Sequence, residues 1–301
     1  MILMTVKPRL TDTRLSARMP SMSGVQIVTL TTDFGLADPY VGAMKGVILS
    51  IIPHAQLVDI THEIPPQEIR QTAFVLYAVW PFFPPRTIHL VVVDPGVGSR
   101  RRPIAGQTAH GLFVGPDNGV FSYVMAQEPV NALVELVDPQ YRLAQVSQTF
   151  HGRDIFAPAA AHLAAGVPLH RLGPAVHDPV MLAPPALSVS PGRISGEVLC
   201  IDHFGNAITS IGRLSWDGAV LSLEPAFAAN GSSGARIPAA QASVSMAGRE
   251  LRGVRRTYAD VDAGEVLALV GSTGHLELAV REGSGADALD LQPGDVVVLR
   301  W

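Results

Sequence analysis

The sequence predicts an α/β first part with a mainly parallel central sheet, followed by a smaller β-rich, barrel-like second part. In the first part, short valine-rich and isoleucine-rich runs alternate with segments of helical spacing. A proline-rich stretch follows at 184–193, and after it short strand-like runs replace the helical spacing. We therefore expect a disordered tail at 1–24, an α/β domain at 25–183, a linker at 184–193 and a β-rich domain at 194–301.

The elements of the α/β part are expected to alternate. The expected strands are 25–32, 57–60 and 90–93, and the expected helices are 40–52 and 68–80. This order implies parallel strands joined by right-handed crossovers. Asp33, Asp59 and Asp94 lie at strand ends, so we expect them along one edge of the sheet. Ligands bind at that edge in open α/β sheets.

The remaining elements are shorter. We expect a hairpin at 104–114, a turn at 115–119, and helices at 120–126 and 155–165. In the β-rich part the expected strands are 194–201, 219–223, 264–270, 275–280 and 295–300. No internal repeat is evident.

Composition excludes several classes of protein. The chain has 301 residues, a formal net charge of −4, 48% hydrophobic and 16% charged residues, which favours a large folded core over disorder. The absence of a basic excess argues against nucleic-acid and membrane-surface partners. Cys200 is the one cysteine, so no internal disulfide can form, which fits a cytoplasmic protein. Cys200 lies in an apolar run and is expected to be a buried small hydrophobic residue.

The turn after the 90–93 run is the first candidate for chemistry. Asp94 is followed by Pro-Gly-Val-Gly and then by three arginines, Arg100 to Arg102. A carboxylate and a guanidinium on one tight turn suit catalysis, although a capped turn with solvated arginines has the same pattern. His151 and Gly152 lie just before the expected helix at 155–165, where a ligand can meet a helix N-terminus.

Two other kinds of site are weighed against this one. Asp33, Asp59, Asp94, His62 and His151 together form a candidate ligand set for a divalent-metal-dependent hydrolase. No compact motif such as H-E-x-x-H supports that set. A dinucleotide site is disfavoured because Gly96-Val97-Gly98 lacks the third glycine and the following helix.

Six motifs, in this order, resemble one family over residues 25–301. They are Thr31-Thr32-Asp33-Phe34-Gly35, Asp94-Pro95-Gly96-Val97-Gly98 with Arg101, Pro116-Asp117-Asn118-Gly119, Thr149-Phe150-His151-Gly152-Arg153-Asp154, Asp202-His203-Phe204-Gly205-Asn206 and Gly271-Ser272-Thr273-Gly274. The family is that of the S-adenosyl-L-methionine hydrolases (adenosine-forming), or SAM hydroxide adenosyltransferases, which are related to the fluorinase and chlorinase.

This resemblance implies that water attacks the ribose 5′ carbon of S-adenosyl-L-methionine and releases adenosine and L-methionine. It implies Asp94, Arg101 and His151 as the catalytic set. The halogenating relatives have tyrosine at the position of Asp94, and Tyr-Ser at His151-Gly152. Both positions are of the hydroxide type here, which argues against a halide nucleophile.

The resemblance also implies substrate contacts. Asp33 would hold the two ribose hydroxyls, and Asn206 an edge of the adenine. Asp38, Asp202 and Ser272 would surround the methionine end, and Phe150, Phe204 and Tyr258 would line the nucleoside. Thr273 and Gln67 depart from the fluorinase, which has arginine and tryptophan at these positions.

The resemblance further implies a homotrimer with its sites at subunit interfaces. The expected activity needs no metal and no cofactor, since S-adenosyl-L-methionine is the substrate. Two alternatives stay open: the metal-dependent hydrolase, and a non-catalytic protein that binds S-adenosyl-L-methionine or adenosine. The second alternative would not need Asp94, Arg101 and His151 together.

Overall fold

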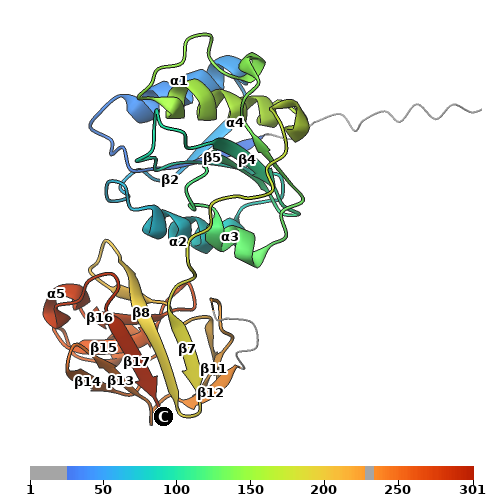
Figure 1. Ribbon diagram of the computed structural model, residues 1–301. Helices are drawn as coiled ribbons and strands as arrows, with labels where there is room; N and C mark the ends of the chain where they lie inside the picture. The colour runs from blue at the N-terminus through green and yellow to red at the C-terminus, as the bar shows by residue number, and fades with distance from the viewer. Residues whose placement is uncertain (1–25, 228–233) are drawn as a thin grey trace, which may run out of the picture.

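The computed structural model describes residues 26–227 and 234–301, so the tail expected at 1–24 lies outside the described residues. Figure 1 shows two parts of the molecule, joined by one extended segment of the chain. We call residues 26–183 the α/β half and residues 184–301 the β-rich half. Across the described residues, none of the helices combines the length and apolar character that crossing a bilayer requires.

A six-stranded sheet forms the centre of the α/β half. Its strands are β1 (Ile27–Thr32), β2 (Gln56–Thr61), β3 (Ile88–Val92), β4 (Pro103–Gln107), β5 (Leu112–Pro116) and β6 (Ala132–Glu135), in the order β2-β1-β3-β5-β4-β6. The first four strands in that order are parallel, and β4 runs antiparallel to both neighbours. The mainly parallel sheet and the hairpin expected at 104–114 are therefore confirmed.

Helices cover both faces of this sheet. The helices are α1 (Tyr40–Ile51), α2 (Ile69–Val79), α3 (Ser122–Gln127) and α4 (Ala157–Ala164). Helices α1 and α4 pack together on one face, and α2 and α3 pack together on the other (Figure 1). Helix α1 buries Val41, Met44 and Ile48, which recur on one side of a helix. This double cover explains why β3 is buried along its whole length.

Short helical turns complete the α/β half. They are η1 (Trp80–Phe82), η2 (Pro139–Tyr141), η3 (Gly152–Phe156) and η4 (Leu169–Arg171). The turn η3 is a π-helix that continues directly into α4, so the helix expected at 155–165 begins earlier than predicted. His151 is the residue that caps this π-turn.

The β-rich half is an antiparallel, nearly closed barrel, as expected. Its strands are β7 (Leu187–Ser190), β8 (Arg193–Ile201), β9 (Ala207–Thr209), β10 (Leu214–Asp217), β11 (Val220–Leu223), β12 (Ala235–Pro238), β13 (Ser243–Met246), β14 (Arg249–Arg252), β15 (Val266–Val270), β16 (Leu276–Val280) and β17 (Val296–Arg300), with α5 (Gly285–Leu289) and η5 (Tyr258–Asp260). The large sheet has the order β14-β13-β17-β8-β9-β16-β15, and β10, β11 and β12 form a second sheet. The two ends of the large sheet approach each other where Arg255 N donates to Ala268 O at 2.7 Å.

The segment 184–193 is more ordered than a linker. Although its prolines predict a free connection, it contains β7, which pairs antiparallel with β8 from Leu187 to Ser190. Prolines at the ends of a strand leave the hydrogen bonds between them intact, so a proline-rich stretch does not exclude a short strand.

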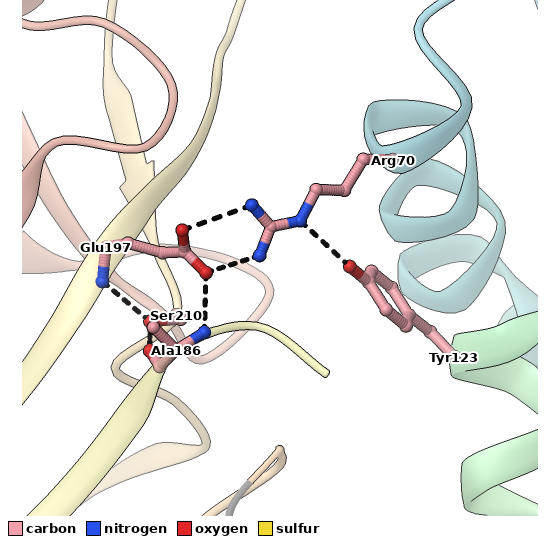
Figure 2. A network of polar contacts seen from close by, with 5 residues as sticks. All are labelled: Arg70, Tyr123, Ala186, Glu197 and Ser210. Atoms are coloured by element: carbon pink, nitrogen blue, oxygen red, sulfur yellow. Dashed lines mark hydrogen bonds and ion pairs between the residues drawn. The ribbon is translucent and has the colours of Figure 1, made fainter. Parts of the chain in front are cut away.

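An apolar cluster and an ion-pair network join the two halves. Phe74 and Tyr123 of the α/β half pack with Leu199 and Phe227 of the β-rich half. Figure 2 shows Arg70 of α2 facing Glu197 of β8, with Arg70 Nη1 3.1 Å from Glu197 Oε2 and a second bond to Oε1.

The same network reaches both halves through its flanking groups. Arg70 Nε donates to the hydroxyl of Tyr123 at 3.3 Å, and the amide of Ala186 donates to Glu197 Oε1. Ser210 Oγ accepts from the amide of Glu197 at 2.9 Å. The hydrogen bonds that Arg70 donates to Glu197 raise the pKa of Arg70, so its guanidinium stays charged.

Candidate active site

The turn after β3 places Asp94 and Arg101 side by side. Val97 N donates to Asp94 O at 3.2 Å and Ser99 N donates to Gly96 O at 3.1 Å, so the turn folds back on itself. Gly98 has a φ of +74°, and a Cβ there would lie 2.4 Å from the carbonyl oxygen of Gln148. Glycine is required at this position by both the dihedral angle and the close approach.

The structure brings Asp94, Arg101 and His151 into contact with one another. Arg101 Nε lies 2.9 Å from Asp94 Oδ1, and Nη2 donates to the other oxygen of the carboxylate. The same Nη2 lies 3.2 Å from His151 Nδ1. The side chains of Asp94 and Arg101 are only 5% and 7% exposed, so this ion pair is desolvated. The guanidinium also covers the Phe156 ring, 5.2 Å from its centroid.

The protonation of His151 follows from its neighbours. Burial lowers the pKa of His151, the positive charge of Arg101 lowers it further, and Asp94 only partly opposes them. The imidazole is therefore neutral at pH 7. Because a guanidinium nitrogen can only donate, Nδ1 accepts from Arg101 and the imidazole proton lies on Nε2.

Asp94 and His151 line a cavity of about 430 Å³ at the carboxyl edge of the sheet. We call it the site cavity. Asp33, at the end of β1, lines it as well. Asp33 Oδ2 accepts from the amide of Gln67 at 2.9 Å, which leaves further lone pairs of the carboxylate for a ligand. Arg101 is absent from the lining, so it acts on the cavity through Asp94 and His151.

Three aromatic rings form one wall of the site cavity. Phe34, Tyr40 and Phe150 pack edge to face, with centroids 5.2–5.9 Å apart. Of these, Phe150 is predicted from the sequence, whereas Phe34 and Tyr40 are missed. Their position directly beside the Asp33 turn and at the start of α1 is the signal that could have found them.

The predicted residues of the β-rich half gather in a second place. Asp202 accepts hydrogen bonds from the amides of Phe204 (2.9 Å) and Asn206 (2.8 Å) and from the Asn206 side chain (2.9 Å). The same side-chain nitrogen lies 3.2 Å from the hydroxyl of Tyr258. These four residues do not line the site cavity within one chain.

Two predicted substrate residues lie apart from both groups. Asp38 is exposed and is not part of the lining of the site cavity. Ser272 lines a different cavity of about 320 Å³, together with Trp80 and Arg213 at the junction of the two halves. Within a single chain, neither Asp38 nor Ser272 lines the cavity that Asp94 lines. The sequence motifs could not indicate this, because a motif does not report which parts of the folded chain meet.

Glu277 is a buried acidic residue that sequence reasoning missed. Burial and the nearby charge of Asp202 raise its pKa to about 7, and a hydrogen bond with Tyr258 partly opposes this. Its carboxylate fills the space beside Gly271, where a Cβ would lie 1.6 Å from Glu277 Oε1. An acid within the apolar run Leu276–Val280 was the available signal.

The five residues considered as metal ligands from the sequence do not all come together in the structure. Asp59 lies within β2, not beyond its end, and contacts Lys45 Nζ at 2.6 Å and His62 Nε2 at 3.0 Å. Neither Asp59 nor His62 lines the site cavity. Among residues 26–227 and 234–301, no three His, Cys, Asp or Glu side chains group so as to hold a metal ion.

Cys200 is buried, as expected. Burial raises the pKa of its thiol to about 12, which leaves no thiolate at neutral pH to act as a nucleophile.

The fold and the site define an α/β protein with a ligand cavity at the carboxyl edge of its parallel strands. The family model of the SAM hydroxide adenosyltransferase N-terminal domain matches residues 28–173, and that of the C-terminal domain matches residues 196–298. The chain belongs to the SAM hydroxide adenosyltransferase family.

Individual relatives agree with this assignment. The chain is 41% identical over 277 residues to an (R)-S-adenosyl-L-methionine hydrolase of Salinispora tropica, covering 89% of this chain and 95% of the relative. It is 39% identical to the corresponding hydrolase of Thermus thermophilus, covering 89% and 96%. A fluorinase of an Actinoplanes species is 30% identical over 222 residues, covering 65% of this chain and 74% of the fluorinase.

A solved structure supports the fold. The crystal structure of an uncharacterized conserved protein from Thermotoga maritima matches with a TM-score of 0.79 and 36% identity. The match covers 92% of this chain and 100% of that structure. The resemblance that the six motifs indicate is therefore confirmed at the level of the family and of the fold.

Proposed function

We propose that this chain hydrolyses S-adenosyl-L-methionine to adenosine and L-methionine by attack of water on the ribose 5′ carbon. The observation that carries the proposal is the desolvated Asp94–Arg101–His151 network at the wall of the site cavity. Relatives about 40% identical over most of the chain are named for this hydrolysis. A protein that only binds the substrate has no need for such a network.

The proposed step displaces a neutral thioether. The oxygen of water forms a bond to C5′, the C5′–S bond breaks, and its electron pair goes to the sulfonium sulfur. Because the leaving thioether is uncharged, no general acid is needed. The protein contributes mainly by aligning the water and accepting its proton, and alignment alone can contribute up to about 7–11 kcal/mol.

The hydrogen bonds of the network suggest a division of labour. With its proton on Nε2, His151 donates to the water oxygen and orients it. Asp94 then accepts the proton that the water loses, through a lone pair that Arg101 does not use. Arg101 fixes both groups, and its charge stabilises hydroxide character as it develops.

In this proposal the substrate spans two copies of the chain. Asp33 accepts both ribose hydroxyls, since two carboxylate oxygens match two adjacent hydroxyls, and Phe150 packs against the nucleoside. Asp202, Asn206, Phe204 and Tyr258 contact adenine and methionine from a neighbouring copy, in a homotrimer.

Asp38 and Ser272 are proposed at the methionine end of the substrate. Both lie away from the site cavity of their own chain, so this assignment depends on the assembly. No cofactor is invoked, because S-adenosyl-L-methionine supplies both the electrophilic carbon and the leaving group.

The chemistry is tested with isotopic water. The purified chain is treated with EDTA and incubated with S-adenosyl-L-methionine in ¹⁸O-water, beside the variants Asp94→Ala and His151→Ala. Adenosine carrying ¹⁸O, together with methionine, is expected from the wild type and not from either variant. Asp178→Asn is a matched control, because Asp178 also pairs with an arginine, Arg102 at 2.8 Å, but lies outside the site cavity.

The alternatives give different results in the same experiment. Turnover that stops with EDTA and returns with a divalent ion would support the metal-dependent hydrolase. Tight binding without turnover under either condition would support a binding protein.

The assembly is tested by complementation. Asp94→Ala and Asn206→Ala are expected to be inactive alone, and part of the activity should return when the two variants are mixed through a dissociating step. Recovery requires that Asp94 and Asn206 of one site come from different copies. A fully active monomer in sedimentation experiments at high dilution would refute the shared site.

A further inference from the structure

His62 connects two residues of the α/β half that the proposed function does not use. Its ring is buried, with Nδ1 2.8 Å from Thr32 Oγ1 and Nε2 3.0 Å from Asp59 Oδ1. Asp59 in turn accepts a hydrogen bond from Lys45 Nζ at 2.6 Å. A line of four side chains therefore runs from the surface to Thr32, the residue before Asp33.

The hydrogen bonds at Thr32 have a defined direction. Because His62 Nε2 faces a carboxylate, the imidazole proton lies on Nε2, and Nδ1 accepts the hydroxyl proton of Thr32. Thr32 Oγ1 is then free to accept from the amide of Phe34 at 3.3 Å. The hydroxyl thus connects the ring of His62 to the backbone on the far side of Asp33.

The main chain of His62 adds a second connection to the same turn. Gly35 N donates to the carbonyl oxygen of His62 at 2.8 Å. Gly35 has a φ of +63°, so the turn reverses sharply at this residue. His62 therefore holds the residues on both sides of Asp33, one through its ring and one through its carbonyl group.

Charge supports the outer end of this line. The N–H of His62 Nε2 does not point along the line to Asp59 Oδ1, so electrostatic attraction carries that contact. Partial burial raises the pKa of Asp59, but Lys45 and His62 outweigh burial and lower it overall. Asp59 is therefore ionised at neutral pH and holds the imidazole in place, although its side chain is 41% exposed.

We propose that Asp59, His62 and Thr32 act as positioning residues for Asp33 and so determine how tightly the ribose diol is bound. This inference rests on the proposed function, in which Asp33 accepts the two ribose hydroxyls. Among the residues that the structure describes, the hydrogen bond to the Asp33 carboxylate comes from the amide of Gln67. The orientation of the second carboxylate oxygen therefore depends on the backbone of the turn. His62 stabilises the conformation of this turn through its ring contact with Thr32 and its carbonyl bond with Gly35 N.

The test compares two threonines on one strand. Thr32→Val removes the hydroxyl that connects His62 to the turn, with little change in side-chain shape. Thr29→Val is the matched control, because Thr29 is equally buried on β1 and its Oγ1 makes the same kind of bond to a buried histidine, His89 Nδ1, at 2.9 Å. Asp59→Asn, at a partly exposed position, is a second variant that is expected to fold.

Kinetics are measured with S-adenosyl-L-methionine and with its 2′-deoxyribose analogue. Thr32→Val is expected to raise the KM for the natural substrate roughly threefold to tenfold with little change in kcat, the effect of one misdirected hydrogen bond. Asp59→Asn should raise it in the same sense. With the 2′-deoxyribose analogue the increase should largely vanish, because one of the two hydroxyls that Asp33 accepts is missing.

Several results would overturn the inference. They are an unchanged KM in both variants, an equal increase in Thr29→Val, or an equal increase with the 2′-deoxyribose analogue. Calorimetric binding of adenosine gives the same comparison without turnover. Wild-type turnover with unaffected variants would overturn the inference alone. A wild-type chain that neither turns over S-adenosyl-L-methionine nor binds adenosine would overturn the proposed function as well.

Discussion

At the scale of residues, the shape of Arg101 matters as much as its charge. Its forked guanidinium contacts both oxygens of Asp94 and also reaches His151 Nδ1. A lysine carries the same charge on a single nitrogen and cannot make all three contacts. The tautomer of His151 and the aim of Asp94 both depend on this fork.

Arg101→Lys is therefore expected to lower kcat by roughly 100-fold or more, the range for losing a positioned acid–base group. Steady-state kinetics and the melting temperature are measured together. Arg102→Lys makes the same change one residue later, where the guanidinium contacts Asp117 and Asp178. That control should stay close to the wild type in kcat, and similar kcat values for the two variants would contradict the role given to Arg101.

The pH dependence of the reaction should reflect the neutral form of His151. Burial, then the charge of Arg101, lower its pKa from 6.5, so the imidazole gains its second proton only at acidic pH. We expect kcat/KM to be level around neutrality and to fall only on the acid side of pH 6.5, measured over roughly pH 4 to 8. In His151→Asn, which does not titrate, this acid limb should change shape. A limb centred above 6.5 would contradict the lowered pKa.

At the scale of elements, a single turn determines the geometry of the catalytic pair. Gly98 combines a φ of +74° with a close approach to the Gln148 carbonyl group. Gly98→Ala should therefore lower the free energy of unfolding by at least about 2 kcal/mol and reduce activity, measured by urea denaturation and by kinetics.

Gly42 offers the matched control for this substitution. It lies in α1 with open space where a Cβ would be. Gly42→Ala should leave activity intact and stabilise the chain by up to about 1 kcal/mol, because alanine favours a helix more than glycine does. A Gly98→Ala variant as stable as Gly42→Ala would contradict the required glycine.

A comparison of elements and contacts shows which features of the fold the sequence could predict and which it could not. The valine-rich run before Asp94 and the helical spacing of α1 are local patterns, so both elements were predicted correctly. The site contacts join distant residues, and spacing along the chain does not report them. Thr32 meets His62 thirty positions away, and Asp94 meets His151 through Arg101.

At the scale of the whole molecule, Arg70 and Glu197 fasten the two halves beside an apolar cluster. A double-mutant cycle with Arg70→Met and Glu197→Gln should give a coupling energy of about 1 kcal/mol, since the arginine side chain is 40% exposed. Arg236 and Asp217 form a largely exposed pair within the β-rich half and serve as the control cycle. Their coupling should be near zero in urea denaturation, and equal couplings would contradict a special contribution from the junction.

Strand β7 has a further consequence for how copies of this chain can come together. It pairs antiparallel with β8 from Leu187 to Ser190, and the amide of Ala186, the residue before it, donates to Glu197 Oε1. The other end of the connecting segment is held to the α/β half, because Val180 N donates to Asp117 Oδ1 and Leu182 N donates to Ser122 Oγ, both at 2.8 Å. To exchange its β-rich half with a second copy, a chain would have to break these bonds and the Arg70–Glu197 contact. We therefore expect copies of this chain to associate as folded units rather than by domain swapping.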